Sequence, residues 1–248
     1  MKEQKQGWDK AAKEDVMLHT LEGERWTRDE YFLAGTKDAE AFARILFDLM
    51  DFNPSGKRML DIGCGIGRVT TAFADMFGEA YGVDFSPEMI ARARELSANK
   101  SNLYFAINDG TSLSMFEGEY FDFCFSYAMF QHITEIRIIN EYICEIGRVL
   151  KPGGIFAFNF NGRRWGPAKF PIIHRDFYSF LLRVGLLSKV ARIYFRIILG
   201  GGEVEALAYP GLWLSSAKLE RMVRQAGLEL LQTNGKKLVW FSGRKPRG

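Results

Sequence analysis

The chain has 248 residues, which is enough for one large domain with a substantial core, and its composition (47% hydrophobic, 25% charged) is that of an ordinary globular protein. A net charge of +3 gives none of the general basic character of nucleic-acid-binding proteins, so we expect no nucleic-acid partner. The N-terminal segment lacks the apolar core of a secretory signal, no run approaches the roughly 18 apolar residues of a membrane span, and the cysteines form no CxxC pair, which predicts a cytoplasmic protein with reduced thiols and no metal site.

The first predicted element is a helical N-terminal cap at residues 1–50, which ends in the apolar-rich run AFARILFDLM. Within it, Trp26 and Tyr31 are candidates for a lid over a ligand, and plain packing is the alternative.

From residue 57 onward, short β-rich runs alternate with helical patterns, which is typical of a parallel α/β sheet. Strands are predicted at 58–63, 79–84, 103–108, 121–127 and 154–160, and helices at 67–77, 86–98 and 136–150. At the far end, a capped helix at 215–226 precedes two strands, 228–233 and 237–243, around an Asn234–Gly235 turn that favours a hairpin. The sequence therefore predicts a mostly parallel sheet that closes with an antiparallel hairpin.

The stretch MLDIGCGIGR places three glycines at alternate positions directly after the first strand: Gly63, Gly65 and Gly67. Such loops let the backbone approach a ligand closely. A dinucleotide-binding loop needs GxGxxG, but Arg68 stands where the third glycine would fall, and the GK[ST] ending of a P-loop is absent.

The pattern Asp61-x-Gly63-x-Gly65-x-Gly67 resembles the first motif of the class I S-adenosylmethionine-dependent methyltransferases, of the small-molecule (methyltransferase 11/25-like) type. The resemblance continues in order over residues 57–160, through YGVD, NDG, FDFCFSYAMFQHI and RVLKPGGIFAF. It implies a Rossmann-like, seven-stranded α/β sheet in the order 3-2-1-4-5-7-6, with the last strand antiparallel and helices on both faces. It also implies S-adenosylmethionine as the cofactor and S-adenosylhomocysteine as the product.

The resemblance further implies roles for single residues. The glycine loop and Asp61 would hold the methionine part of the cofactor, Asp84 would accept from both ribose hydroxyls, and Asp109 would accept from the adenine amino group. The implied cofactor-binding residues are Asp61, Gly63, Cys64, Gly65, Gly67, Asp84, Phe85, Met89, Asn108, Asp109, Gly110, Ser126 and Tyr127. Two alternatives stay open: Asp109 could be an ordinary Asp-Gly turn, and Phe85 and Met89 could be core residues.

Methyl transfer requires the protein to hold the acceptor in line with the methyl group, exclude water and remove a proton. His132 is the only histidine within the matched motifs, and its ordinary pKa suits a general base near neutrality. The alternative is that His132 caps or packs at the start of the next helix. Gln131 is a candidate to orient the acceptor.

Residues 162–214 form an insertion of mainly helical pattern, and the part from 162 to 200 carries eight basic residues and one acidic residue. Apolar stripes at helical spacing make this part a basic amphipathic hairpin. It could be a plain cap with solvated charges, or a lid for an anionic or amphiphilic acceptor with peripheral membrane contact. Its exposed faces could also form a homodimer contact. Tyr209 and Trp213 are candidates to line the acceptor pocket.

The sequence thus predicts an N-terminal cap (1–50), a cofactor-binding core (51–161 and 215–248) and a basic insertion (162–214). The expected activity is transfer of a methyl group from S-adenosylmethionine to an O or N of a small-molecule or lipid-like acceptor. An NAD-dependent oxidoreductase and a non-catalytic S-adenosylmethionine-binding regulatory protein are the alternatives.

Overall fold

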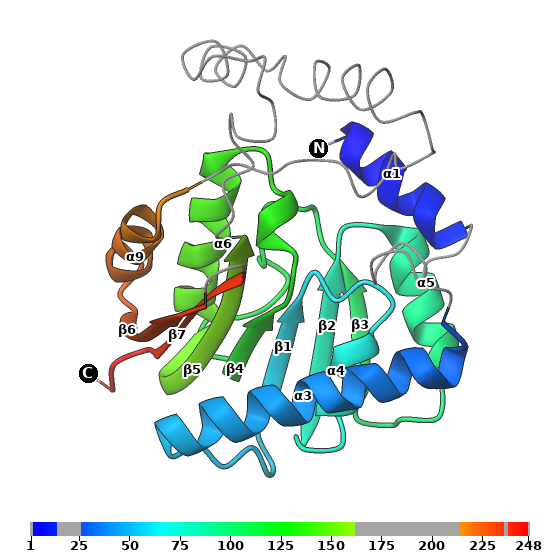
Figure 1. Ribbon diagram of the computed structural model, residues 1–248, viewed down its shortest axis with the longest axis horizontal. Helices are drawn as coiled ribbons and strands as arrows, with labels where there is room; N and C mark the ends of the chain where they lie inside the picture. Colours follow the sequence, from blue (N-terminus) through cyan, green and yellow to red (C-terminus); the bar gives the residue numbers. More distant parts are fainter. Residues whose placement is uncertain (1, 14–25, 162–213, 236–237, 248) are drawn as a thin grey trace.

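The computed structural model describes residues 2–13, 26–161, 214–235 and 238–247 (Figure 1). In these ranges seven strands form one sheet in the order β3-β2-β1-β4-β5-β7-β6, which confirms the order that the sequence resemblance implied. The strands are β1 (Arg58–Ile62), β2 (Glu79–Asp84), β3 (Leu103–Ile107), β4 (Phe121–Ser126), β5 (Leu150–Asn161), β6 (Glu229–Asn234) and β7 (Leu238–Arg244). The first five strands pair in parallel, and β7 runs antiparallel to both β5 and β6.

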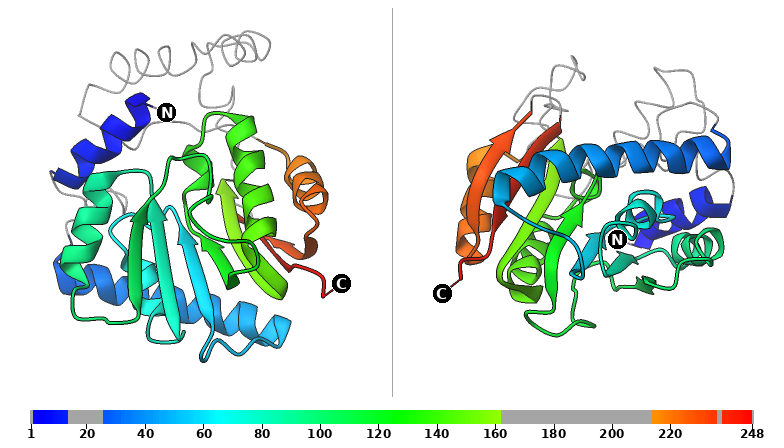
Figure 2. Two further views of the ribbon diagram at one scale, coloured as in Figure 1. Left: turned by 180° about the vertical axis from the view of Figure 1, so that it is seen from behind. Right: turned by 90° about the horizontal axis from the view of Figure 1, so that it is seen from below.

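Helices cover both faces of the sheet (Figures 1 and 2). The helices are α1 (Lys2–Lys13), α3 (Arg28–Met50), α4 (Arg68–Phe73), α5 (Pro87–Leu96), α6 (Ile136–Val149) and α9 (Ser216–Gln225), with a short 3-10 turn at Phe130–His132. Helices α3 and α4 pack on one face around Phe73, Phe123 and Phe125, and α6 and α9 pack on the other around Ile143 and Phe156. Burial of these aromatic and aliphatic side chains on both faces holds the layers together.

The helix starts follow from local sequence. Thr27 and Glu30 form a reciprocal capping box at the start of α3, and the Ser86 hydroxyl caps α5, which has Pro87 in its first turn. Ser215 caps α9 in the same way. These side chains satisfy backbone N–H groups that have no partner within the helix.

Two predicted boundaries are wrong by several residues. The helix expected at 67–77 ends at Phe73, because the chain then tightens into bonds such as Asp75 N–H to the Ala72 carbonyl. The strand expected at 154–160 begins at Leu150, because Leu150 already pairs with Phe121 across a register shift in β4. The shift lets the strand continue on both sides of the KPGG sequence.

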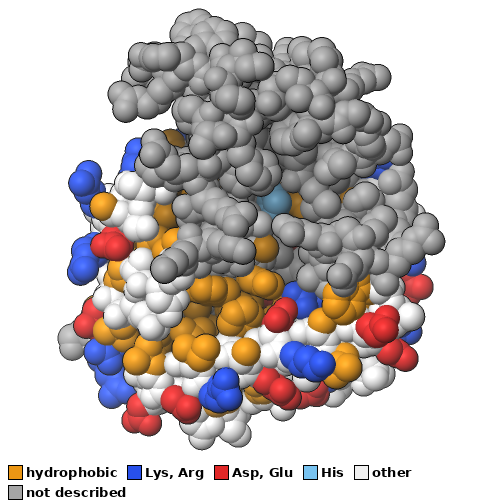
Figure 3. All heavy atoms as spheres, viewed as in Figure 1, with side chains coloured by type: hydrophobic (Ala, Val, Ile, Leu, Met, Phe, Trp, Pro, Cys, Tyr) orange, Lys and Arg blue, Asp and Glu red, His pale blue; other side chains and the backbone are white. Residues whose placement is uncertain are grey.

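One surface of the molecule is strongly apolar. Figure 3 shows hydrophobic side chains gathered over the sheet beside α3, whereas charged side chains follow the outer side of that helix. No helix in the described ranges is long and apolar enough to cross a membrane.

Candidate active site

The parallel strands β1, β2 and β4 end at one edge of the sheet, and the glycine loop follows β1 there. Two N–H groups of the loop, those of Gly63 and Cys64, donate to the Val83 carbonyl at 2.8 and 3.1 Å, which ties the loop to the end of β2. Gly63, Gly65 and Gly67 all have positive φ, at 76°, 54° and 80°. This left-handed backbone is the reason for glycine here, since other residues adopt it at a cost of about 1–2 kcal/mol.

The surroundings of these glycines differ. A Cβ atom on Gly63 would overlap Cγ of Met129, so the glycine loop and Met129 are in direct contact. Among the described residues, nothing lies within 4 Å of a Cβ placed on Gly65. The backbone of Gly65 is therefore open on the side where a ligand can approach.

Two carboxyl groups lie beside the loop. Asp84 Oδ2 accepts from the Gly65 N–H at 3.1 Å and Oδ1 from the Ser86 N–H at 2.9 Å. Burial raises the pKa of Asp84 to about 6, although these N–H bonds oppose the shift. Asp61 is 3% exposed and accepts from the Thr70 hydroxyl at 2.6 Å. Burial, with the nearby charge of Asp84 adding to it, raises the pKa of Asp61 to about 7 although Thr70 opposes it.

Cys64 lies between these carboxyl groups. Burial and then the charges of Asp84 and Asp61 raise the pKa of the Cys64 thiol well above its ordinary value. The thiol is therefore neutral, and it is not an activated nucleophile. In the described part of the chain, no group of three His, Cys, Asp or Glu residues is placed to hold a metal ion.

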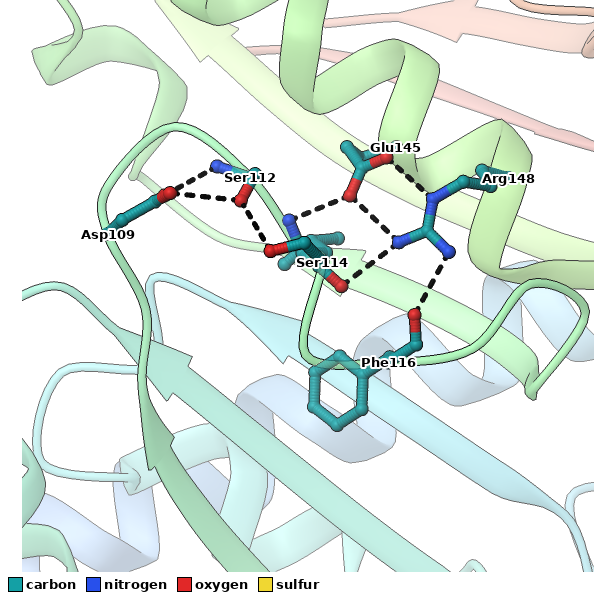
Figure 4. Close-up of polar contacts among 7 residues, drawn as sticks. Asp109, Ser112, Ser114, Phe116, Glu145 and Arg148 are labelled. Carbon is teal, nitrogen blue, oxygen red and sulfur yellow. Dashed lines mark hydrogen bonds and ion pairs between the residues drawn. The ribbon is translucent and has the colours of Figure 1, made fainter.

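Residues 108–116 follow β3 and are held by a polar network (Figure 4). Asp109 Oδ1 accepts from the N–H groups of Thr111 and Ser112, both at 2.7 Å. Asp109 therefore forms a turn, as the Asp-Gly alternative for this residue predicted. Burial acts to raise the pKa of Asp109, but the bonds from Thr111 and Ser112 hold it below its ordinary value. Asp109 is exposed and Gly110, with φ of 80°, is buried.

An ion pair on α6 clamps the same segment. Glu145 Oε2 accepts from the Leu113 N–H at 2.8 Å, and Arg148 donates to the carbonyls of Leu113 and Phe116 at 3.0 and 2.9 Å (Figure 4). Arg148 also donates to Glu145 at 2.6 Å. Charge-assisted bonds of this kind are stronger than neutral ones, so the segment after β3 has a fixed shape.

Asn108 is buried at the end of β3. Its N–H donates to the Asp84 carbonyl at 3.0 Å, and its Nδ2 donates to the Tyr142 hydroxyl at 2.8 Å. Its Oδ1 is buried, and in the described part of the chain it has no hydrogen-bond partner. Buried acceptors without a partner are uncommon in proteins, and the Asn108 Oδ1 atom can accept from an N–H or O–H group of a ligand.

Residues that follow β4 form the other side of the site. Ser126 is fully buried, and its hydroxyl donates to the Ile62 carbonyl at 2.8 Å, so it links β4 to β1 and is not exposed to a ligand. Tyr127 is half-buried and stacks on Trp240 with ring centroids 5.8 Å apart. Burial raises the pKa of Tyr127 above its ordinary value. Ala128 has a positive φ of 61°, and its N–H donates to Asn159 Oδ1 at 2.7 Å.

Arg68 occupies the position where a dinucleotide loop has glycine. It is 7% exposed, and its Nη1 donates to Asp38 Oδ2 at 2.7 Å. Its guanidinium lies 5.6 Å from the ring centroid of Tyr31 and 6.0 Å from that of Tyr127. The arginine therefore joins α3 to the start of α4 beside the site, a role that no local pattern predicted.

Helix α1 lies next to α5 at the same edge of the sheet (Figures 1 and 2). Its Asp9 accepts from the Ser86 hydroxyl at 2.5 Å, and its Trp8 ring packs edge-on against His132 with centroids 5.4 Å apart. Burial lowers the pKa of His132 to about 4, and its Nε2 lies 3.3 Å from Gln131 Nε2. Sequence reasoning missed Trp8 and Asp9 as site residues, because neither belongs to a motif.

The remaining predicted residues fall into three groups. Met89 is 1% exposed and packs with Tyr31 and α1, which is the core alternative for this residue, and Trp26 packs against the same cluster. Phe85 is half-buried. Tyr209, Trp213 and the basic stretch 162–200, with its expected membrane and dimer contacts, lie outside the described residues.

Comparison with known proteins finds similarity over the middle of the chain. The model of a family described as a methyltransferase domain matches residues 60–158. The chain is 35% identical over 109 residues to 2-methyl-6-phytyl-1,4-hydroquinone methyltransferase of Synechocystis, covering 44% of this chain and 33% of that protein. It is 31% identical over 123 residues to ubiquinone biosynthesis O-methyltransferase of Bradyrhizobium, covering 50% and 47%. The chain thus spans half or less of the length of these curated relatives.

A solved structure supports the fold. Magnesium protoporphyrin IX methyltransferase of Synechocystis, with bound S-adenosylhomocysteine, aligns over 97% of both chains with a TM-score of 0.63 at 14% identity. At this identity the likeness concerns the fold alone.

We expect Gly63→Ala to destabilise the protein more than Gly65→Ala. Both substitutions put a Cβ on left-handed backbone, which costs about 1–2 kcal/mol. Only the Gly63 variant also forces a Cβ into Met129, which adds roughly 1 kcal/mol or more. Urea unfolding of both variants measures the difference, and equal losses would contradict the contact between the glycine loop and Met129.

We expect the stability difference between wild type and His132→Gln to depend on pH. Between about 4 and 6.5, unfolded His132 binds a proton and folded His132 does not, because its folded pKa is lowered to about 4. Wild type should therefore lose stability relative to the variant as pH falls from 6.5 to 4, and the difference should level off below. Urea unfolding across this range tests it, and a constant difference would show that folding does not lower the pKa of His132.

Proposed function

We propose that this chain, whose residues 60–158 match the model of a methyltransferase-domain family, transfers a methyl group from S-adenosylmethionine to an O or N of a small-molecule or lipid-like acceptor. One observation carries the proposal: the open backbone of Gly65 is hydrogen-bonded to the half-buried carboxylate of Asp84 at the end of the neighbouring strand. A ligand can therefore approach the Gly65 backbone closely and donate hydrogen bonds to the Asp84 carboxylate beside it.

The residues fit the cofactor by their chemistry. Each Asp84 oxygen accepts one backbone N–H and keeps capacity for a ribose hydroxyl. The unpartnered Oδ1 of Asn108 and the carboxylate of Asp109 are acceptors for the adenine amino group. The Gly63–Gly67 loop and Asp61 would hold the methionine part, which carries positive charge. When bound, S-adenosylmethionine supplies an electrophilic methyl group on a sulfonium.

In this proposal His132 orients the methyl acceptor and does not act as a general base with an ordinary pKa. Because its pKa is lowered to about 4, its imidazole is neutral near pH 7 and only weakly basic. It can accept a hydrogen bond from the acceptor's O–H or N–H and so orient the nucleophile. Trp8 of α1 covers the ring and limits water around it.

The relatives and the charge of the insertion support the proposed class of methyl acceptor. The relatives above are a hydroquinone methyltransferase and an O-methyltransferase of ubiquinone biosynthesis. Another relative, phosphoethanolamine N-methyltransferase 2 of Caenorhabditis elegans, is 38% identical over 119 residues, which cover 47% of this chain and 26% of that protein. We infer an acceptor with an apolar or amphiphilic body, and the basic stretch 162–200 favours one that carries negative charge.

Two measurements test the proposal. Calorimetry with S-adenosylhomocysteine tests cofactor binding, with NAD as the comparison because Arg68 replaces the third glycine of a dinucleotide loop. A screen of quinols, phospho-amines and lipids for S-adenosylhomocysteine release tests turnover. Binding without release from any acceptor class would favour the regulatory alternative, and tighter binding of NAD would overturn the proposal.

We expect Asp84→Asn to weaken S-adenosylhomocysteine binding roughly 10- to 100-fold, since hydrogen bonds to a charged group are worth about 1.5–3 kcal/mol. Calorimetry on both proteins measures the change. Asp75→Asn is the matched control, because Asp75 is a solvent-exposed carboxylate paired with Lys100. Equal affinity of wild type and Asp84→Asn would exclude Asp84 from the cofactor site.

A further inference from the structure

Ala128 has an unusual backbone conformation for its residue type. In the described part of the chain, only Asp51, Glu119 and Ala128 are non-glycine residues with positive φ. Asp51 and Glu119 are exposed, whereas Ala128 is half-buried and lies at the active site. Left-handed conformations of this kind persist only where the surroundings enforce them.

The surroundings of Ala128 are provided by Asn159. The Ala128 N–H donates to Asn159 Oδ1 at 2.7 Å across 31 residues of sequence. Asn159 is 0% exposed, and its backbone is held in the middle of the sheet, where it is paired with Trp240 of β7. The acceptor for the Ala128 N–H is therefore rigid.

The conformation of Ala128 sets the residues that follow it. Met129 comes next and contacts the Gly63 position of the glycine loop. The His132 N–H then donates to the Met129 carbonyl at 2.9 Å and closes the 3-10 turn. A change at Ala128 would therefore move Gln131 and His132 relative to the glycine loop.

A purely structural role does not explain why Asn159 is an amide. Its Nδ2 is buried and has no hydrogen-bond partner among the residues that the structure describes. Its neighbours on β5 are apolar, so an apolar side chain would avoid the cost of burying this donor. The Asn159 amide therefore accepts a hydrogen bond from the Ala128 N–H through its Oδ1, while burial of its Nδ2 costs stability.

We propose that Asn159 is a positioning residue of the active site: its amide oxygen holds Ala128 in the left-handed conformation and thereby places Tyr127, Gln131 and His132 against the glycine loop. The consequence for catalysis rests on the proposed function. The structural link itself can be tested in the cofactor-free protein.

The test compares Asn159→Leu with the double variant Asn159→Leu/Ala128→Gly. The readout is the pKa of His132, measured by NMR titration in the absence of ligand. In Asn159→Leu the loop loses its anchor, so the pKa should rise from about 4 toward the ordinary histidine value of about 6.5. Because glycine adopts left-handed backbone without strain, the double variant should move the pKa back toward the wild-type value.

Asn102→Leu is the matched control. The half-buried Asn102 also has a side-chain amide that holds the backbone: it donates to the Ala74 carbonyl at 2.7 Å, at the opposite end of β3 from Asn108. It should lower the melting temperature without moving the pKa of His132. An unchanged pKa in Asn159→Leu, or a double variant that behaves like the single one, would overturn the proposal.

If Asn159→Leu does not fold, Ala128→Val tests the same link in the wild-type background. A β-branched residue does not adopt this conformation, so the pKa of His132 should again rise, and an unchanged value would overturn the proposal. Failure of the wild type to bind S-adenosylhomocysteine would overturn the proposed function instead, and it would leave this titration unaffected.

Discussion

Parallel pairing of β1 with β2 and β4 is the constraint from which the site follows. It brings the ends of these strands to one edge of the sheet, so that the glycine loop meets the carboxylate of Asp84 and the residues after Ser126. The bond from the Gly65 N–H to Asp84 is the direct expression of this arrangement. Because neither strand end could form the site alone, the chemistry depends on the strand order.

Burial then decides the charges of the site. It favours the neutral form of the Cys64 thiol and of the His132 imidazole, and it raises the pKa of Asp61 and Asp84. A cationic ligand would therefore stabilise the negative charge of Asp61 and Asp84. A bound sulfonium or ammonium group would lower both carboxyl pKa values, since opposite charges favour the ionised form.

Contacts distant in sequence complete the site. Ser86 caps α5 and also donates to Asp9, which lies 77 residues earlier, and Trp8 covers His132. The N-terminal helix thus packs on residues of the second and fourth strand ends. On the other side, Asn159 anchors the turn that carries His132. The histidine is therefore held from α1, which lies before the matched motifs, and from β5.

The sequence by itself determined the sheet and the glycine loop that follows its first strand. Alternating apolar runs, caps such as Ser86 and the spacing of Gly63, Gly65 and Gly67 are local features, and local sterics and hydrogen bonding are enough to interpret them. Only the tertiary structure decided the roles of Trp8, Arg68 and Asn159, and the surroundings that lower the pKa of His132. These depend on burial and on partners far along the chain, which short-range patterns do not encode.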